Sequence, residues 1–281
     1  MMQKSKGPFK VKIIVGFHKP YWMPTDKMYL PLRLGAALEE DDSDTRFGKM
    51  GASYERDDTG DNISGLNRTF CELTGLYWAW KNVDADYIGL VHYRRYFKGR
   101  RKKNLSMSIL KYEDIKDRLG TVKIFLPPKR RYFIETLYSH YAHTHEADHL
   151  KITRAVLAKK YPQYLPSCDR VYHSRSGYMF NMMIMEKELL DEYCSWLFDI
   201  LFILKDKIST EGLSDYQRRI FGRISEILNN IWLDHQIETG RIKKENIREL
   251  PLIYMEKPKW GEKIPAFLKA KFLGVKYTRS F

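Results

Sequence analysis

The sequence has few cysteines and no long apolar run. Its three cysteines are Cys71, Cys168 and Cys194. They are far apart and odd in number, so neither a disulfide framework nor the spacing of a metal site is visible. The longest apolar stretch, 196–204, contains Asp199 and is too short to span a bilayer. The first 12 residues are polar and basic and lack the apolar segment of a signal peptide. We therefore expect a protein that stays in the reducing cytosol.

Acidic residues are outnumbered by basic ones. The 281 residues include 49 Lys and Arg against 35 Asp and Glu, which gives a net charge of +14. Such an excess attracts polyanions, which include nucleic acid, anionic membranes and phosphorylated substrates, and composition alone does not choose among them. The hydrophobic fraction of 43% is ordinary for a folded protein. The length fits one large α/β domain, or a domain with an appendage.

Apolar runs and helical periodicity alternate along the chain. The expected strands are 10–17, 87–91, 121–126 and 178–185. The expected helices are 62–80, 132–161, 189–204 and 216–235. Residues 41–61, rich in Asp, Gly and Ser, are expected to form a surface excursion. This alternation predicts an α/β fold with a mostly parallel central sheet flanked by helices, in which ligands bind beyond the carboxyl ends of the strands.

Cationic side chains follow two of the expected strands. His18 and Lys19 come after the first strand, and His92, Arg94 and Arg95 come after the second. Arginine forks bind phosphate oxygens and lysine supplies a point charge, so this edge of the sheet suits a diphosphate. The alternative is a solvated basic loop.

Asp84, Ala85 and Asp86 spell the Asp-x-Asp signature with which many glycosyltransferases hold a divalent metal ion. This triplet precedes the strand 87–91, however, and therefore belongs to the opposite edge of the sheet, where a solvated turn is the simpler interpretation. We hypothesise that cationic side chains neutralise the diphosphate without a metal. Mn²⁺ or Mg²⁺ is left open as a cofactor, with His92 as the candidate ligand.

Two longer motifs are more specific. They are CELTGLYWAWKN at 71–82 and YIGLVHYRRYF at 87–97, with DNIS at 61–64 and Asn67 just upstream. With these motifs the chain resembles a bacterial family catalogued as of unknown function and encoded in capsule and exopolysaccharide gene clusters. Some of its members are described as glycosyltransferases, including galactofuranosyltransferases. The resemblance covers nearly the whole chain.

The resemblance implies a GT-A-like fold that binds nucleotide sugars. It also implies a UDP-sugar donor and transfer of a hexosyl group, galactofuranosyl or galactosyl, to a lipid-linked saccharide on undecaprenyl diphosphate. Such a protein would work in capsule, exopolysaccharide or O-antigen synthesis, at the inner face of the cell membrane. Its partners would be the donor, the lipid-linked acceptor and the anionic membrane surface, and not nucleic acid.

The reaction needs a base for the acceptor hydroxyl and positive charge for the leaving nucleotide diphosphate. Glu226 is the first candidate for the base, since Arg219 and Arg223 lie one to two turns before it on the expected helix. A surface pair between Glu226 and Arg223, three residues apart, is the alternative. Asp148 and Asp169 are the reserve candidates.

Further polar residues are candidates for donor binding. Asn62 either contacts the donor or caps its helix, and Glu72 either contacts the ribose or pairs with a cation. Asn181 stands out as a polar residue in an otherwise apolar strand. The predicted donor-binding residues are His18, Lys19, Asn62, Asn67, Glu72, His92, Tyr93, Arg94, Arg95, Asn181 and Arg219.

Two clusters of rings are interpreted as structural. Tyr77, Trp78 and Trp80 are expected in the core rather than as a platform for a sugar. A group of four histidines is expected on a polar helix face rather than at a metal ion, because no cysteine or second ligand cluster is nearby. These histidines are His140, His143, His145 and His149.

The chain is divided into a transferase domain at 1–250 and a basic amphipathic segment at 251–281. The part from 257 onward mixes aromatic and apolar residues with lysines, as segments that lie in membrane interfaces do. A helix docked on its own domain is the alternative.

Two other functions remain open. The net charge and the basic runs 98–103 and 129–131 are compatible with a nucleic-acid-binding protein. A non-catalytic partner in a polysaccharide synthesis complex is the third possibility.

Overall fold

The computed structural model describes residues 8–38, 53–100 and 104–256. Its centre is a sheet in which the strands follow the order β10-β6-β9-β4-β1-β2-β3. These strands are β1 (Val11–Phe17), β2 (Tyr29–Arg33), β3 (Glu55–Arg56), β4 (Tyr87–His92), β6 (Ile124–Leu126), β9 (Met183–Glu186) and β10 (Ile247–Glu249). All of them run in parallel except β9, which is antiparallel to both β4 and β6. The predicted α/β fold with a mostly parallel sheet is confirmed.

Two short strands extend the sheet at the end of β4. β5 (Arg95–Phe97) turns back from β4, and β11 (Leu252–Tyr254) pairs with β5. The described part of the domain therefore continues past residue 250, as far as Glu256. The rest of the segment predicted to bind membranes, 257–281, lies outside the described residues.

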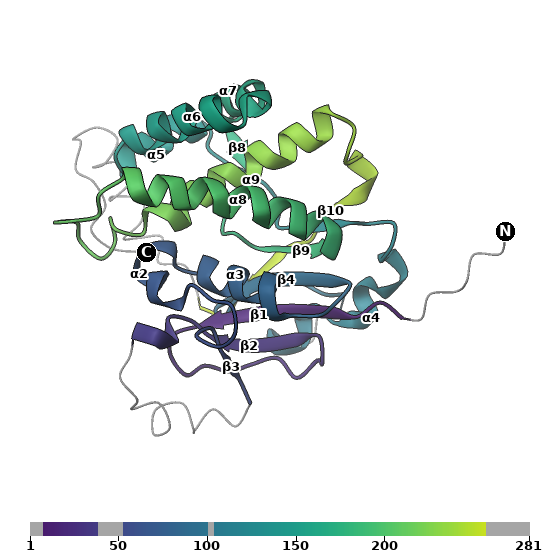
Figure 1. Cartoon of the computed structure of the whole chain (residues 1–281). Coiled ribbons are helices and arrows are strands. Elements are labelled where there is room, and N and C mark those ends of the chain that lie inside the picture. Colours follow the sequence, from purple (N-terminus) through teal and green to yellow (C-terminus); the bar gives the residue numbers. More distant parts are fainter. Residues whose placement is uncertain (1–7, 39–52, 101–103, 257–281) are drawn as a thin grey trace.

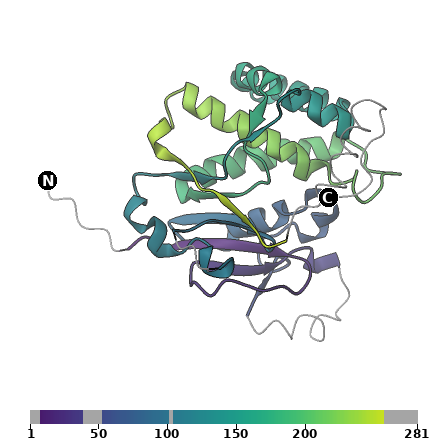
Figure 2. The same cartoon turned by 180° about the vertical axis from the view of Figure 1, so that it is seen from behind.

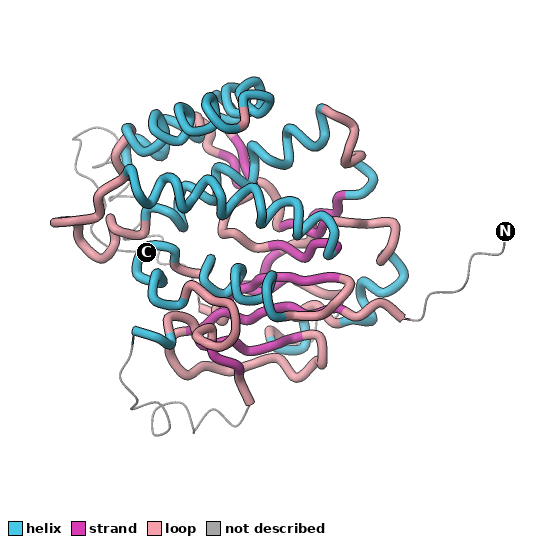
Figure 3. Tube along the Cα trace, in the orientation of Figure 1, coloured by secondary structure: helices cyan, strands magenta, loops and turns pink. Residues whose placement is uncertain are grey.

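Long helices cover one face of the sheet (Figure 1). α3 (Leu73–Asn82), α8 (Lys187–Lys207) and α9 (Ile220–Glu238) bury their apolar sides against it. A further layer lies above α8 and α9 and consists of α5 (Leu137–Thr144), α6 (Asp148–Lys160) and α7 (Leu165–His173). The other face is covered by α4 (Tyr112–Ile115) and by connecting segments (Figures 2 and 3). A two-stranded ribbon, β7 (Arg130–Arg131) with β8 (Ser176–Gly177), stands apart from the sheet.

Three predicted elements are divided or shortened. The helix expected at 62–80 is a 3₁₀ turn (Ser64–Leu66), then α2 (Asn67–Phe70) and α3, with a break at Cys71. The helix expected at 132–161 is α5 and α6, separated at 145–147. The strand expected at 178–185 begins only at Met183, because Phe180 and Asn181 have positive φ angles and cannot continue an extended strand.

The aromatic residues of α3 lie in the core, as predicted. Trp78 is buried, and the rings of Tyr77 and Trp80 pack against Phe198 of α8. Trp80 also donates from Nε1 to Asp191 Oδ1 at 2.9 Å. These contacts join α3 to α8.

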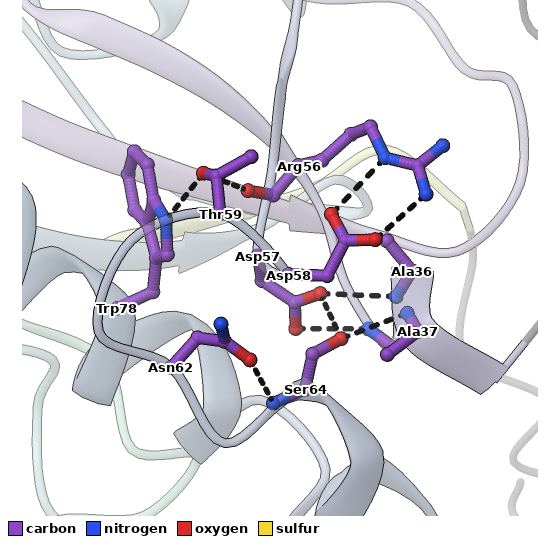
Figure 4. Close-up of polar contacts among 10 residues, drawn as sticks. Ala36, Ala37, Arg56, Asp57, Asp58, Thr59, Asn62, Ser64 and Trp78 are labelled. Atoms are coloured by element: carbon purple, nitrogen blue, oxygen red, sulfur yellow. Dashed lines mark hydrogen bonds and ion pairs between the residues drawn. The ribbon is translucent and has the colours of Figure 1, made fainter.

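Of the surface excursion expected at 41–61, residues 41–52 lie outside the described residues, and 59–61 are exposed as expected, but Asp57 is not. Asp57 is fully buried and accepts hydrogen bonds from the backbone N–H groups of Gly35 and Ala36, at 2.9 and 3.0 Å. It also accepts from the hydroxyls of Ser64 and Thr74, at 2.6 and 2.7 Å. Figure 4 shows the Asp57 carboxylate between the loop after β2 and the turn before α2. One carboxylate thus ties together the carboxyl ends of β2 and β3 and the start of α3.

Removing the Asp57 carboxylate should destabilise the fold strongly. Asp57→Ala leaves four buried donors without their acceptor, and we expect the free energy of unfolding to fall by about 3–5 kcal/mol. The matched control is Asp58→Ala, because the neighbouring Asp58 is partly exposed and pairs with the single partner Arg56 (Figure 4). That change should cost about 1 kcal/mol or less. Urea unfolding of both variants measures the difference, and equal losses would contradict the assignment.

Candidate functional site

The predicted ligand edge is where the structure brings candidate residues together. β1 ends at Phe17 and β4 at His92, and the two strands are parallel. β9 is antiparallel to β4, so the segment that leads into it, 178–182, lies at the same edge. The side chains that follow β4 form an outer group and an inner group.

The outer group surrounds Tyr93. The Tyr93 hydroxyl lies 3.5 Å from His18 Nε2, and the Lys19 ammonium lies 5.8 Å from the Tyr93 ring. Arg94 Nη1 donates to Glu256 Oε2 at 3.2 Å, and both of these side chains are about half exposed. Three predicted donor-binding residues, His18, Lys19 and Arg94, are therefore gathered around a fourth, the buried Tyr93.

The inner group is organised by the side-chain amide of Asn181, which is 2% exposed. Its Nδ2 donates to Glu72 Oε1 at 2.8 Å and to the Gly222 carbonyl at 3.0 Å. The Ser225 hydroxyl lies 3.0 Å from its Oδ1. The amide therefore joins the start of α3 and the first turn of α9 to the segment that leads into β9.

Cys71 and Glu72 enter this group through the break between α2 and α3. Cys71 has a φ of 54°, and the Asn67 amide donates to its carbonyl at 2.8 Å. Arg219, at the start of α9, donates from Nε to Cys71 Sγ at 3.1 Å. Burial raises the pKa of the Cys71 thiol, with Arg219 opposing the rise. Burial therefore favours the neutral thiol.

A small cavity opens beside these residues. It has a volume of about 20 Å³ and is lined by Cys71, Glu72, Arg219, Gly222, Arg223 and Glu226. Arg223 Nη1 lies 3.8 Å from Glu226 Oε1, so the predicted pair exists. The Glu226 side chain is only 7% exposed, and the pair is therefore buried rather than on the surface. A cavity of this size admits one group about as large as a water molecule.

The two carboxyls at the cavity have opposite pKa shifts. Burial alone raises the pKa of Glu72, but His92, Arg219 and the Asn181 amide together bring it below its ordinary value. Burial raises the pKa of Glu226, and the Glu72 charge adds to the rise while Arg223 opposes it. Glu72 thus favours its anionic form, and Glu226 is the carboxyl that holds a proton more readily than an ordinary glutamate.

His92 is held by a hydrogen bond to the backbone. Its Nε2 lies 2.8 Å from the Phe180 carbonyl, which can only accept, so this nitrogen carries the proton. Burial lowers the pKa of His92 although Glu72 opposes the shift. The ring therefore fixes the segment at Phe180.

Arg95 lies between the inner and outer groups. Its guanidinium stacks over the Phe180 ring at 3.8 Å, and it senses the charges of Glu72 and Glu226 as well as that of Arg94. Its Nε is buried and has no hydrogen-bond partner in the described part of the chain. A buried guanidinium with an unused donor is suited to bind an anion.

One wall of the site, next to the β7–β8 ribbon, could not be predicted from the motifs. Tyr132, directly after β7, is buried, and burial raises its pKa to about 12, with Arg130, Glu226 and Arg223 as electrostatic neighbours. Its ring centroid lies 4.3 Å from that of His140. Only the pairing of β7 with β8 brings these residues beside α9, and two-residue strands leave no signal in a sequence.

The four histidines do not form the single polar helix face that was predicted. His145 and His149 are buried, and His145 packs against the ring of Tyr216. His140 and His143 donate from Nδ1 to the two oxygens of buried Glu135, at 2.8 and 2.6 Å. A carboxylate at the start of α5 thus orients two of the rings.

Other candidates lie elsewhere. Asp148 pairs with Lys151 and Asp169 with Arg154, both on exposed parts of the helical layer. Asn62 and Asn67 hydrogen-bond within the segment that leads into α3. They therefore help to position the inner group at the start of α3. Asp84 pairs with Lys10 at the opposite edge of the sheet, where the turn was expected.

The residues at the cavity do not fit a divalent cation. Both carboxyls already face arginines, His92 Nε2 carries a proton, and the ligand edge after β4 offers Arg94 and Arg95 in place of acidic groups. Within residues 8–38, 53–100 and 104–256, no three side chains of the metal-binding types gather at one point. We derive no step through a metal ion.

Comparisons with known proteins agree with this geometry. The chain is similar to the bifunctional glycosyltransferase WbbM, solved in its apo form, with 29% sequence identity and a TM-score of 0.77. The similarity covers 88% of this chain and 46% of WbbM, so the chain spans about half the length of that protein. No curated protein has a significantly matching sequence. The fold is therefore GT-A-like.

A family model adds to this likeness. It is described as DUF4422, a domain of unknown function, and it matches residues 12–237, which include both the outer and the inner group. The chain belongs to this family.

Proposed function

We propose that the chain transfers a hexosyl group, galactofuranosyl or galactosyl, from a UDP-sugar to a lipid-linked saccharide at the cytoplasmic face of a membrane. The observation that carries this proposal is the pairing of a cationic, donor-rich sheet edge with one protonatable carboxyl. Its support from outside the chain is the similarity to a glycosyltransferase over 88% of the residues.

In this proposal the cations hold the donor's diphosphate. Arg95 offers a buried donor between the two groups, and Arg219 lines the cavity beside Glu226. Negative charge grows on the diphosphate as the glycosidic bond breaks. Fixed guanidinium groups in a partly dry site stabilise that charge without reorganising.

Glu226 acts as the base in this proposal. Its carboxylate accepts the proton of the acceptor hydroxyl as that oxygen attacks the anomeric carbon, while UDP leaves with the bonding electron pair. The cavity beside Glu226 admits a group the size of a hydroxyl. Arg223 stays beside Glu226 and steadies its anionic form.

Replacing Arg95 should weaken nucleotide binding. We expect calorimetry to show UDP binding to the wild type in preference to GDP and dTDP, and Arg95→Gln to raise the Kd for UDP about 30-fold, since a charge-assisted contact contributes about 2 kcal/mol. Arg248→Gln, on the exposed edge strand β10, should leave the Kd unchanged. The absence of any nucleotide binding, together with salt-sensitive binding of DNA, would contradict the proposal and favour a nucleic-acid-binding protein.

Metal removal should have little effect. Because arginines occupy the positions where acidic metal ligands would stand, we expect UDP affinity and turnover after exhaustive chelation to stay within about twofold of the values with Mn²⁺. Titrations and activity assays with EDTA, Mn²⁺ and Mg²⁺ measure this. A strict requirement for either ion would overturn the assignment of the diphosphate site.

Glu226→Gln should separate binding from turnover. It keeps the shape of the side chain but removes the base, and we expect turnover of UDP-galactose with a lipid-linked acceptor to fall by at least 10²-fold. The Kd for UDP should change by less than about threefold, and Glu245→Gln, on the exposed turn before β10, should behave as wild type. Because the pKa of Glu226 is raised, wild-type activity should be lost as the pH falls through a value above that of an ordinary glutamate.

Two results would count against Glu226. One is a variant that keeps more than a tenth of the activity. The other is an acidic limb of the rate profile that is the same in Glu226→Gln and in wild type. UDP binding without turnover by the wild type would instead indicate a non-catalytic partner in a synthesis complex.

A further inference from the structure

The connection from the ribbon to α5 exposes two large apolar side chains in succession. Phe133 is 81% and Ile134 is 65% exposed, the two highest values among the large hydrophobic residues that the structure describes. They stand between β7 and α5, beyond the sheet edge that carries the site. Side chains that are exposed to this degree, next to each other, mark a surface that is covered by something else.

The residues that lead to this tip alternate between two faces. Lys129, Arg131 and Phe133 are exposed, whereas Tyr132 is buried and Arg130 is half-buried with its guanidinium 4.9 Å from the Tyr132 ring. This is the two-residue period of an extended segment. Its inner face forms the wall beside Arg223 and Glu226, and its outer face joins two cations to the apolar tip.

The partner strand of the ribbon adds charge of the same sign. β8 pairs Ser176 with Arg131, and the carbonyl of exposed Arg175 accepts from the Tyr132 N–H at 2.7 Å. Neither 127–134 nor 170–178 contains an acidic residue. No ion pair involves Lys129, Arg131 or Arg175 within the described ranges.

We propose that this tip, Phe133 and Ile134 flanked by Lys129, Arg131 and Arg175, docks the protein on an anionic lipid bilayer. Protruding apolar side chains enter the interface between headgroups and acyl chains, and the cations beside them are drawn to anionic lipid. A protein partner would need a pocket to receive a convex tip, whereas a bilayer receives it without one.

Docking at this point adds a membrane contact to the proposed function. Only the use of the contact, which is to reach a lipid-linked acceptor, rests on that function. The inner face of the same segment closes the site, so a bilayer that holds the tip also holds the site next to a lipid-linked acceptor. The contact itself is separate from catalysis, because neither Phe133 nor Ile134 lines the cavity.

Vesicle sedimentation of the full chain tests the proposal. One set of vesicles is phosphatidylcholine alone. In the other set about one lipid in three is the anionic phosphatidylglycerol. We expect binding to the anionic vesicles to fall at least about tenfold in Phe133→Ser/Ile134→Ser. In Lys129→Glu/Arg131→Glu it should fall at least about 25-fold, since each cation near the surface contributes about a fivefold factor.

Matched controls separate this site from general effects. Lys159→Glu/Lys244→Glu makes the same change in net charge at the end of α6 and at the turn before β10, on the opposite side of the sheet from the ligand edge. Leu105→Ser removes an apolar side chain that is 54% exposed on the connection after β5. Both should bind as wild type does. Thermal unfolding shows whether each variant is folded.

The outcomes are distinct. Unchanged vesicle binding by both tip variants, or equal binding of the wild type to both kinds of vesicle, would overturn the proposal. The same holds if the wild type binds no vesicles and a protein partner requires the tip. UDP titration of the same variants, without lipid, should give the wild-type Kd. Loss of that binding would count against the proposed function and not against the docking surface.

Discussion

The site depends on one buried amide. Asn181 Nδ2 has two N–H groups, and both are used, one on Glu72 and one on the Gly222 carbonyl. Because both of those partners only accept, the amide has a single orientation, with Oδ1 toward Ser225. The start of α3 and the first turn of α9 are far apart in the sequence, and this side chain sets the distance between them. The carboxyls and arginines that line the cavity stand at the start of α3 and on the first two turns of α9.

The electrostatics of the cavity follow from this arrangement. Three arginines surround two carboxyls, so the residues around the cavity have an excess of positive charge, which in the proposed function attracts the donor's diphosphate. The carboxyl that accepts the Asn181 amide becomes the fixed anion, and its charge raises the pKa of the other one. Two glutamates of the same chemistry thereby differ in their protonation because only Glu72 has an amide donor and a neighbouring imidazole.

Much of this could be predicted where a residue's role follows from its place in a regular element. The run 87–91 predicted β4, and with it the position of His92, Arg94 and Arg95 at the ligand edge. Asn181 was noticed as a polar residue among apolar neighbours. The break at Cys71 could not be predicted, because the apolar period continues through it and only a positive φ and the Asn67 hydrogen bond reveal it. The role of Asp57 and the pairing of β7 with β8 depend on tertiary hydrogen bonds, and such bonds produce no periodic pattern in the sequence.

The alternation in 129–133 links surface and site over a short distance. Successive residues of an extended segment are about 3.3 Å apart along the chain, so the tip at Phe133 and the wall at Tyr132 cannot move independently. Tyr132 is buried against His140, whose ring is held by Glu135, and that carboxylate also holds His143. The tip is therefore attached to a buried, hydrogen-bonded cluster rather than to a free loop. In the proposed function, this rigidity lets a contact at the tip fix the orientation of Glu226 and the arginines toward a lipid-linked acceptor.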